Sequence, residues 1–330
     1  MPSETYFAIA FYAILVVVFS TIATGCVFWA RWLWGLSKRN LCGDVSGELI
    51  TRHANQTSTW RQADYFSLFL MMFGVMFLTV AILGGGEPRQ PQADPTTGAE
   101  TETSGDRLTE TVAAPDDDQP AKPKPPLGTQ VRNQFVATLA ALLVALAYLQ
   151  FNLNGGIRQA GLIPTGWDLR CGLIATIWIL TPVLLINLVV SNLVKYEHAV
   201  TNFLAQQNSL GTFSFLMLSA AVLTPIVEEI QFRLLLQGGL QRIAEHPLEP
   251  STVSNWHPSV AWPIYVTSLV FAALHSGQGA APIPLFFLSI GLGFLYQRTG
   301  RIAPAIIVHS LLNGATLCME FARVNAGIGP

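Results

Sequence analysis

Apolar and polar residues alternate along this chain in long blocks rather than in short periods. A helix that crosses the hydrocarbon core of a bilayer, which is about 30 Å thick, needs about 20 predominantly apolar residues. Eight apolar blocks are candidates for such helices: residues 6–30, 65–83, 135–153, 172–194, 213–237, 261–275, 283–297 and 302–321. The pattern predicts an all-α fold, a polytopic transmembrane helix bundle with about eight spans, of which the sixth and seventh are short.

Residues 87–133 interrupt this pattern. They are rich in Pro, Thr, Gly and acidic residues and include the sequence PDDDQPAKPKPP. Such a segment cannot bury enough apolar surface to offset the loss of chain entropy, so we predict a disordered acidic, Pro-rich linker. The linker divides the chain into an N-terminal two-helix transmembrane module, residues 1–86, and a six-helix intramembrane domain, residues 134–330.

The composition agrees with a membrane protein. Hydrophobic residues make up 51% of the chain and charged residues 12%, against about 25% charged residues in soluble domains. The net charge of −2 and the lack of a basic block argue against nucleic acid as a partner. Lys and Arg in the short loops predict that residues 238 and 298 face the cytoplasm. We therefore expect a multi-pass protein in the lipid bilayer of a bacterial inner membrane, with its site open to the cytoplasm.

Several polar residues lie inside the apolar blocks. An ionisable side chain within a span costs about 2.5–3.5 kcal/mol on insertion scales, so its presence indicates a functional site. Because three different blocks contribute such residues, we favour one shared site over separate structural roles. The residues are Glu228, Glu229 and Arg233 in the fifth block, His275 at the end of the sixth, and His309 with its polar neighbour Asn313 in the eighth.

Helical spacing separates the roles of the residues in the fifth block. Glu229 and Arg233 are four residues apart with the acid first, which is the favourable order for an ion pair within a helix. We predict that they form an internal structural pair. The side chain of Glu228 points about 100° away from that of Glu229 around the helix axis. It therefore either pairs with a residue of another helix or takes part in the chemistry.

The sixth and eighth blocks repeat the four-residue spacing. Phe271 and His275 share one helical face, and His309 and Asn313 share another. A carboxylate with a histidine can hold and deprotonate a water molecule. A histidine with an amide can donate hydrogen bonds to an oxyanion. Together with Glu228, these residues predict a hydrolase site for a carbonyl substrate.

Three motifs in this order resemble a known family. EExxxR begins at Glu228, FxxxH ends at His275 and HxxxN begins at His309, as in the CPBP intramembrane proteases, the Abi family that includes the type II CAAX prenyl endopeptidases. The stretch GFLYQRTGRIAPAIIVHSLLN, residues 293–313, resembles the last characteristic block of that family. The resemblance covers about residues 162–318.

The resemblance implies an intramembrane endopeptidase that hydrolyses a peptide bond of a membrane-associated, for example prenylated, peptide or protein. By position, Glu228 is then the general base that activates water, and His275 assists it. His309 and Asn313 stabilise the tetrahedral oxyanion. The residues that would shape the site around them are Glu229, Arg233 and Phe271.

Zinc is a candidate cofactor on the same grounds. Members of the family have been described as metalloproteases, and one Glu with two His could ligate zinc. In this chain the ligands would be Glu228, His275 and His309. A glutamate base needs no metal, and the chain has no HExxH motif, so both mechanisms stay open at this point.

Two other classes of protein compete with the endopeptidase. A proton- or ion-coupled transporter also uses buried Glu and His residues, but it favours inverted repeats or paired broken helices, and no internal repeat is visible. A non-catalytic scaffold that binds a partner protein would not require all three motifs. The sequence therefore favours the intramembrane endopeptidase.

Overall fold

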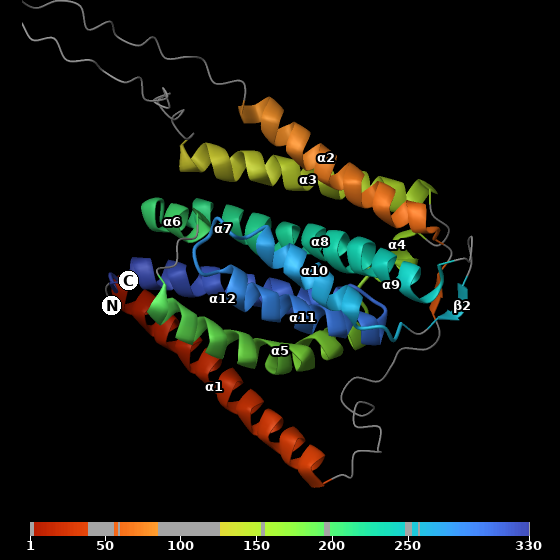
Figure 1. Cartoon of the computed structure of the whole chain (residues 1–330). Helices are drawn as coiled ribbons and strands as arrows, with labels where there is room; N and C mark the ends of the chain where they lie inside the picture. Colours follow the sequence, from red (N-terminus) through yellow and green to blue (C-terminus); the bar gives the residue numbers. More distant parts are fainter. Residues whose placement is uncertain are drawn as a thin grey trace, which may run out of the picture.

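The computed structural model of the chain is a helix bundle (Figure 1) with one small antiparallel pair of strands, β1 (Gln56–Ser58) and β2 (Val253–Trp256). The predicted all-α, polytopic membrane fold is confirmed. The residues that the structure describes are 3–38, 56–58, 60–84, 126–152, 156–194, 199–247, 253–256 and 258–329.

Each of the eight predicted apolar blocks coincides with a helix. The first four correspond to α1 (Ser3–Lys38), α2 (Gln62–Gly84), α3 (Leu127–Asn152) and α5 (Gly166–Leu193). The last three correspond to α10 (Trp262–Ala273), α11 (Pro282–Thr299) and α12 (Ala303–Asn325). Two short helices, α4 (Gly156–Gln159) and α6 (Ala199–Gln206), lie in the connections.

The fifth block forms one continuous composite helix, Leu210–Glu245. It extends eight residues beyond the predicted end at residue 237, because its last turns are buried inside the protein instead of ending at its surface. Its five segments are α7 (Leu210–Leu216), the π-helix η1 (Met217–Leu223), α8 (Thr224–Glu229), the π-helix η2 (Ile230–Gln237) and α9 (Gly238–Glu245).

Two of the eight predicted spans are short. Within the described residues, six helices are long and apolar enough to cross a bilayer: α1, α2, α3, α5, the composite helix and α12. Helix α10 has 12 residues and α11 has 18. They pack against each other as a hairpin on η2.

Helix α3 begins inside the segment predicted to be a linker. Leu127 and Val131 pack in a cluster with Phe203, and this tertiary contact extends the helix to Leu127, ahead of the predicted boundary after residue 133. Most of the predicted linker, residues 87–125, lies outside the described residues. The division of the chain into residues 1–86 and 134–330 stays a prediction.

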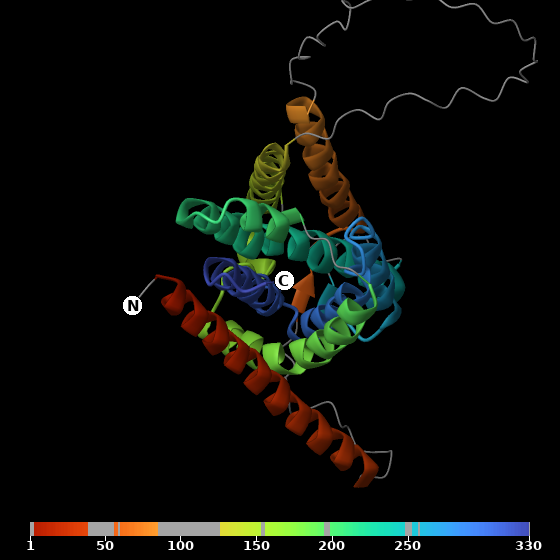
Figure 2. The ribbon, with the colours of Figure 1, turned by 90° about the vertical axis from the view of Figure 1, so that its left-hand side faces the viewer.

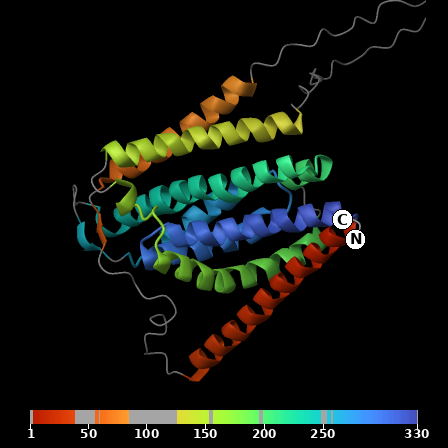
Figure 3. The same ribbon diagram turned by 180° about the vertical axis from the view of Figure 1, so that it is seen from behind.

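The helices form layers in which α12 is central. Helices α2 and α3 pack together on one side and contact the composite helix, while α1 packs on the other side against α5 and α12. Figure 2 shows α12 surrounded by the composite helix, α5 and the α10–α11 hairpin. Both chain ends lie close together (Figure 3), since Phe7 of α1 and Phe321 of α12 stack edge to face at 5.6 Å.

A proline in α5 creates the docking point for α1. Pro182 has no N–H, so the carbonyl of Trp178, four residues earlier, lacks its usual helical donor. The indole N–H of Trp29 in α1 donates to that carbonyl at 3.1 Å. Gly25 allows the helices to approach, because a Cβ at this position would collide with Thr181.

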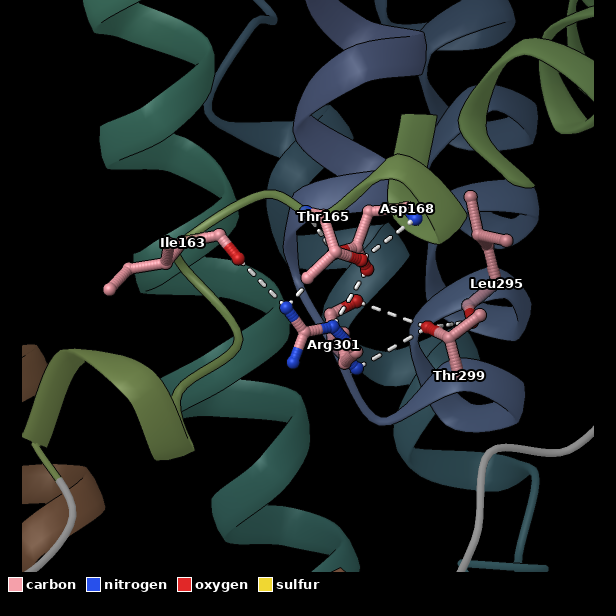
Figure 4. A network of polar contacts seen from close by, with 6 residues as sticks. All are labelled: Ile163, Thr165, Asp168, Leu295, Thr299 and Arg301. Atoms are coloured by element: carbon pink, nitrogen blue, oxygen red, sulfur yellow. Dashed lines mark hydrogen bonds and ion pairs between the residues drawn. The ribbon is translucent and has the colours of Figure 1, made fainter. Parts of the chain in front are cut away.

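A buried ion pair joins the start of α5 to the start of α12 (Figure 4). The guanidinium of Arg301 donates to both oxygens of Asp168, at 2.7 and 2.9 Å, and to the carbonyl of Ile163 at 2.8 Å. Asp168 also forms a capping box with Thr165. Because Asp168 is fully buried, this network fixes the start of α12 at Ala303, six residues before His309.

We expect Asp168→Asn to lower stability by about 3 kcal/mol, because it leaves the Arg301 guanidinium without its charge partner in a buried network. The measurement is the midpoint of thermal unfolding in detergent. The control is Glu320→Gln, which alters an ion pair with Arg323 within one helix turn, where both side chains keep about one fifth of their surface exposed, unlike the fully buried Asp168, and should change stability by less than about 1 kcal/mol. Equal midpoints for the two variants would contradict the role of this network.

Candidate active site

The candidate site lies where the composite helix departs from regular α-helical hydrogen bonding. Helix α8, which carries Glu228 and Glu229, lies between the two π-helical segments. At the end of η1, the N–H of Thr224 donates to the carbonyl of Ser219, five residues back. Such π-helical turns are rare and occur frequently at functional sites.

The predicted internal ion pair is present on this helix. Nε of Arg233 lies 3.1 Å from Oε2 of Glu229, and both side chains are fully buried. The guanidinium carbon of Arg233 also lies 5.3 Å from the centroid of the Phe271 ring, within the range of a cation–π contact. Arg233 therefore has an acid on one side and an aromatic face from α10 on another.

His309 of α12 lies between the two glutamates. Its Nδ1 is 2.9 Å from Oε1 of Glu229, and its Nε2 is 3.6 Å from Oε2 of Glu228. The imidazole is almost completely buried, at 3% exposure. Glu228 thus finds the partner from another helix that its position required. The contact between His309 and Glu229 was not predicted, since helical spacing assigned Glu229 only to Arg233.

His275 lies in the turn that follows α10. Its Nδ1 is 2.8 Å from the carbonyl of Phe271, and because a carbonyl only accepts, Nδ1 carries the proton and Nε2 is left as an acceptor. The Phe271 ring lies 4.8 Å from the His275 ring and 6.2 Å from the His309 ring. Both imidazoles are close enough to Glu228 to interact with it electrostatically. The structure thus brings both predicted histidines around the Phe271 ring.

Asn313 of α12 supplies a hydrogen bond that the backbone of η1 lacks. Its Nδ2 donates to the carbonyl of Ala220 at 2.9 Å. That carbonyl has no helical donor available, because Thr224 donates to Ser219 and the next residue, Pro225, has no N–H. One N–H of the Asn313 amide is therefore occupied, and the second is left for another acceptor. The proline five residues after Ala220 is the sequence signal that could have revealed this contact.

Zinc is the cofactor that the sequence left open for this site. Within the described residues, no group of three or more His, Cys, Asp or Glu side chains is arranged to hold a metal ion. Nδ1 of His309 contacts Glu229, and Nδ1 of His275 donates to the Phe271 carbonyl. Zinc at Glu228, His275 and His309 stays a prediction of the sequence.

Comparison with known proteins gives one match. A family model for type II CAAX prenyl endopeptidases, described as Rce1-like, matches residues 210–315. This segment contains every candidate site residue, and over it the predicted resemblance to the CPBP proteases is confirmed. Comparisons with curated proteins and with solved structures gave no significant match. The first four long helices lie outside the matched segment.

A double-mutant cycle tests the contact between Asn313 and the π-helix. Asn313→Ala should cost about 1–3 kcal/mol, because it leaves the Ala220 carbonyl unpaired. In the Pro225→Ala background the loss should be smaller, because a backbone N–H at position 225 can donate to that carbonyl. The measurement is thermal unfolding of the four proteins, with a coupling energy of about 0.5–3 kcal/mol expected.

The control for this cycle is Asn325→Ala, because the amide of Asn325 donates within its own helix to Phe321. Its effect should add to that of Pro225→Ala. Additive effects for Asn313→Ala and Pro225→Ala would show that the amide does not substitute for the missing backbone donor.

Proposed function

We propose that this protein is an intramembrane endopeptidase that hydrolyses a peptide bond of a membrane-associated substrate with a water molecule activated by Glu228. The observation that carries the proposal is the position of His309, with one ring nitrogen on Glu229 and the other beside Glu228. These side chains lie on membrane helices within the segment that matches the type II CAAX prenyl endopeptidases.

In this proposal Glu228 and His275 hold the attacking water. Glu228 is 20% exposed and His275 is half-buried, so neither side chain is completely enclosed by the protein. Glu228 accepts one proton as the water oxygen bonds to the carbonyl carbon of the substrate. The tetrahedral intermediate then collapses with cleavage of the C–N bond, and the proton on Glu228 passes to the leaving amine.

His309 and Asn313 are proposed to stabilise the oxyanion of that intermediate. The carboxylate of Glu229 accepts a hydrogen bond from Nδ1 of His309, which orients the ring. When Nε2 also carries a proton it can donate to an oxyanion, and so can the second N–H of Asn313. Arg233 neutralises Glu229.

The substrate class follows from the setting of the site. The candidate residues lie on helices of a multi-pass membrane protein, so the scissile bond must belong to a peptide or protein held at the bilayer. We propose a lipid-modified, for example prenylated, substrate, and a site open to the cytoplasm of a bacterial inner membrane. The motif match over residues 210–315 and the Lys and Arg distribution support these assignments.

Glu228→Gln should lower kcat at least about 100-fold, because it removes the proton acceptor without changing the size of the side chain. The assay is cleavage of a fluorogenic prenylated peptide by the full chain in nanodiscs, with Glu320→Gln as the control that keeps wild-type activity. Cleavage by Glu228→Gln at the wild-type rate would remove the assignment. Glu228-dependent proton uptake into proteoliposomes without any peptide cleavage would favour an ion-coupled transporter instead.

Chelation separates the two mechanisms that the sequence left open. If Glu228 activates water directly, pretreatment with 1,10-phenanthroline should leave the rate of cleavage unchanged. The measurement compares treated and untreated enzyme in the same nanodisc assay, with a zinc protease as the positive control. Loss of cleavage that added Zn²⁺ restores would instead assign Glu228, His275 and His309 as metal ligands.

A further inference from the structure

A layer of buried polar side chains lies between η2, α10 and α11, beside the candidate site. Each side chain is at most 1% exposed, and each has a polar atom that makes no hydrogen bond to any described residue. We call this set the polar layer; its members are Arg233 and Gln237 of η2, Thr267 and Ser268 of α10, and Ser289 of α11.

The hydroxyls of the polar layer behave differently from other helical hydroxyls in this protein. Thr176, Thr181 and Thr299 donate to the carbonyl four residues earlier, at 2.6–2.8 Å. This bond is the usual way to satisfy a hydroxyl inside an apolar helix. Ser268 and Ser289 make no such bond, so their hydroxyls need partners that the protein does not supply.

The register of the α10–α11 hairpin places these hydroxyls opposite each other. Gln297 donates to the carbonyl of Val260, and a Cβ on Gly293 would touch Ile264. The two helices are antiparallel, so the step of four residues from Val260 to Ile264 corresponds to the step of four residues back from Gln297 to Gly293. One more step of four residues places Ser268 opposite Ser289, and both side chains are small.

The polar layer is closed at both ends by side chains of η2. At one end, Nε2 of Gln237 donates to the carbonyl of Gly293 at 2.9 Å, while its Oε1 has no donor among the described residues. At the other end, the guanidinium of Arg233 lies over Phe271, one turn beyond Ser268 on α10, and neither Nη1 nor Nη2 has an acceptor there. The layer thus presents donors and acceptors together.

We infer that the polar layer binds ordered water molecules inside the membrane domain. A buried polar atom without a hydrogen bond is destabilising, and the layer contains at least six such atoms: Nη1 and Nη2 of Arg233, Oε1 of Gln237 and the hydroxyl oxygens of Thr267, Ser268 and Ser289. Their combined cost would rival the whole stability of a domain. Such buried polar atoms are normally satisfied by buried water molecules, each of which makes two to four hydrogen bonds.

Water fits this site better than an anion does. The charge of Arg233 is already balanced by Glu229, so an additional anion would be uncompensated in the bilayer. Gln237 Oε1 needs a donor, Arg233 needs acceptors, and water can be both. The bound water hydrates the guanidinium and so keeps the pair of Arg233 and Glu229 charged next to His309. This inference concerns hydration of the fold and holds whether or not the chain is a protease.

The sign of a stability change tests the inference. With water bound, Ser268→Ala and Ser289→Ala each remove a hydrogen bond to water and should lower the midpoint of thermal unfolding of the full chain in nanodiscs. In a dry layer, each change would remove an unsatisfied hydroxyl and raise the midpoint. The control, Ser191→Ala at an exposed position of α5, should leave the midpoint unchanged. A raised midpoint for either layer variant overturns the inference.

Radiolytic labelling of the wild-type chain provides a second measurement that does not depend on folding of a variant. X-ray pulses generate hydroxyl radicals from bound water, and these radicals modify adjacent side chains. Ile264, which lies beside Gly293 next to Gln237, should be modified although it is fully buried, whereas Met72, which is equally buried in an apolar cluster and more reactive, should not. Absence of label on Ile264 overturns the inference.

Discussion

A fully buried carboxylate, that of Glu229, connects the helices that carry the candidate site. Its Oε2 lies 3.1 Å from Nε of Arg233, and its Oε1 lies 2.9 Å from Nδ1 of His309. An unpaired charge is expensive in the hydrocarbon region, so these three side chains must be positioned together. This requirement holds α12 against the composite helix and places Nε2 of His309 beside Glu228.

A second constraint is that backbone carbonyls buried away from water need hydrogen-bond donors. Two prolines show how the rest of the bundle satisfies this constraint. Pro182 leaves the carbonyl of Trp178 without a helical donor, and Trp29 of α1 donates to it. Pro225 likewise leaves the carbonyl of Ala220 without a helical donor, and the amide of Asn313 in α12 donates to that carbonyl. In both cases a break in one helix becomes a specific contact with another, so helix irregularity contributes to tertiary specificity.

The sequence predicted the features that depend on spacing within one helix. The eight helical segments follow from the apolar blocks, and the pair of Glu229 with Arg233 follows from the four-residue interval. It predicted one shared site but not the individual contacts between helices, such as that of His309 with Glu229, because these depend on how the helices pack and on the π-helical turns that change side-chain directions. The helical start at Leu127 was also missed, because it depends on packing against Phe203, which is distant in sequence.

The lengths of α10 and α12 determine where in the bilayer hydrolysis would occur. His309 lies six residues after the start of α12 at Ala303, about 9 Å along that helix, whereas His275 lies just beyond the end of α10, a helix of 12 residues that is roughly 18 Å long. Phe271 nevertheless contacts both imidazoles, so the two helices must be offset or tilted relative to each other.

The loop before α10 is held by one carboxylate. Glu245, at the end of α9, accepts hydrogen bonds from the Trp256 indole and from the backbone N–H groups of Ser259 and Val260, at 2.6–2.7 Å. These bonds fix the start of α10 against the end of α9, while Asp168 anchors the start of α12 through Arg301. A scissile bond beside His309 would then have to enter the bundle by about 9 Å along α12. A peptide with an attached hydrocarbon chain can reach that depth because burial of each CH₂ group contributes about 0.8 kcal/mol, whereas a soluble peptide has no comparable driving force.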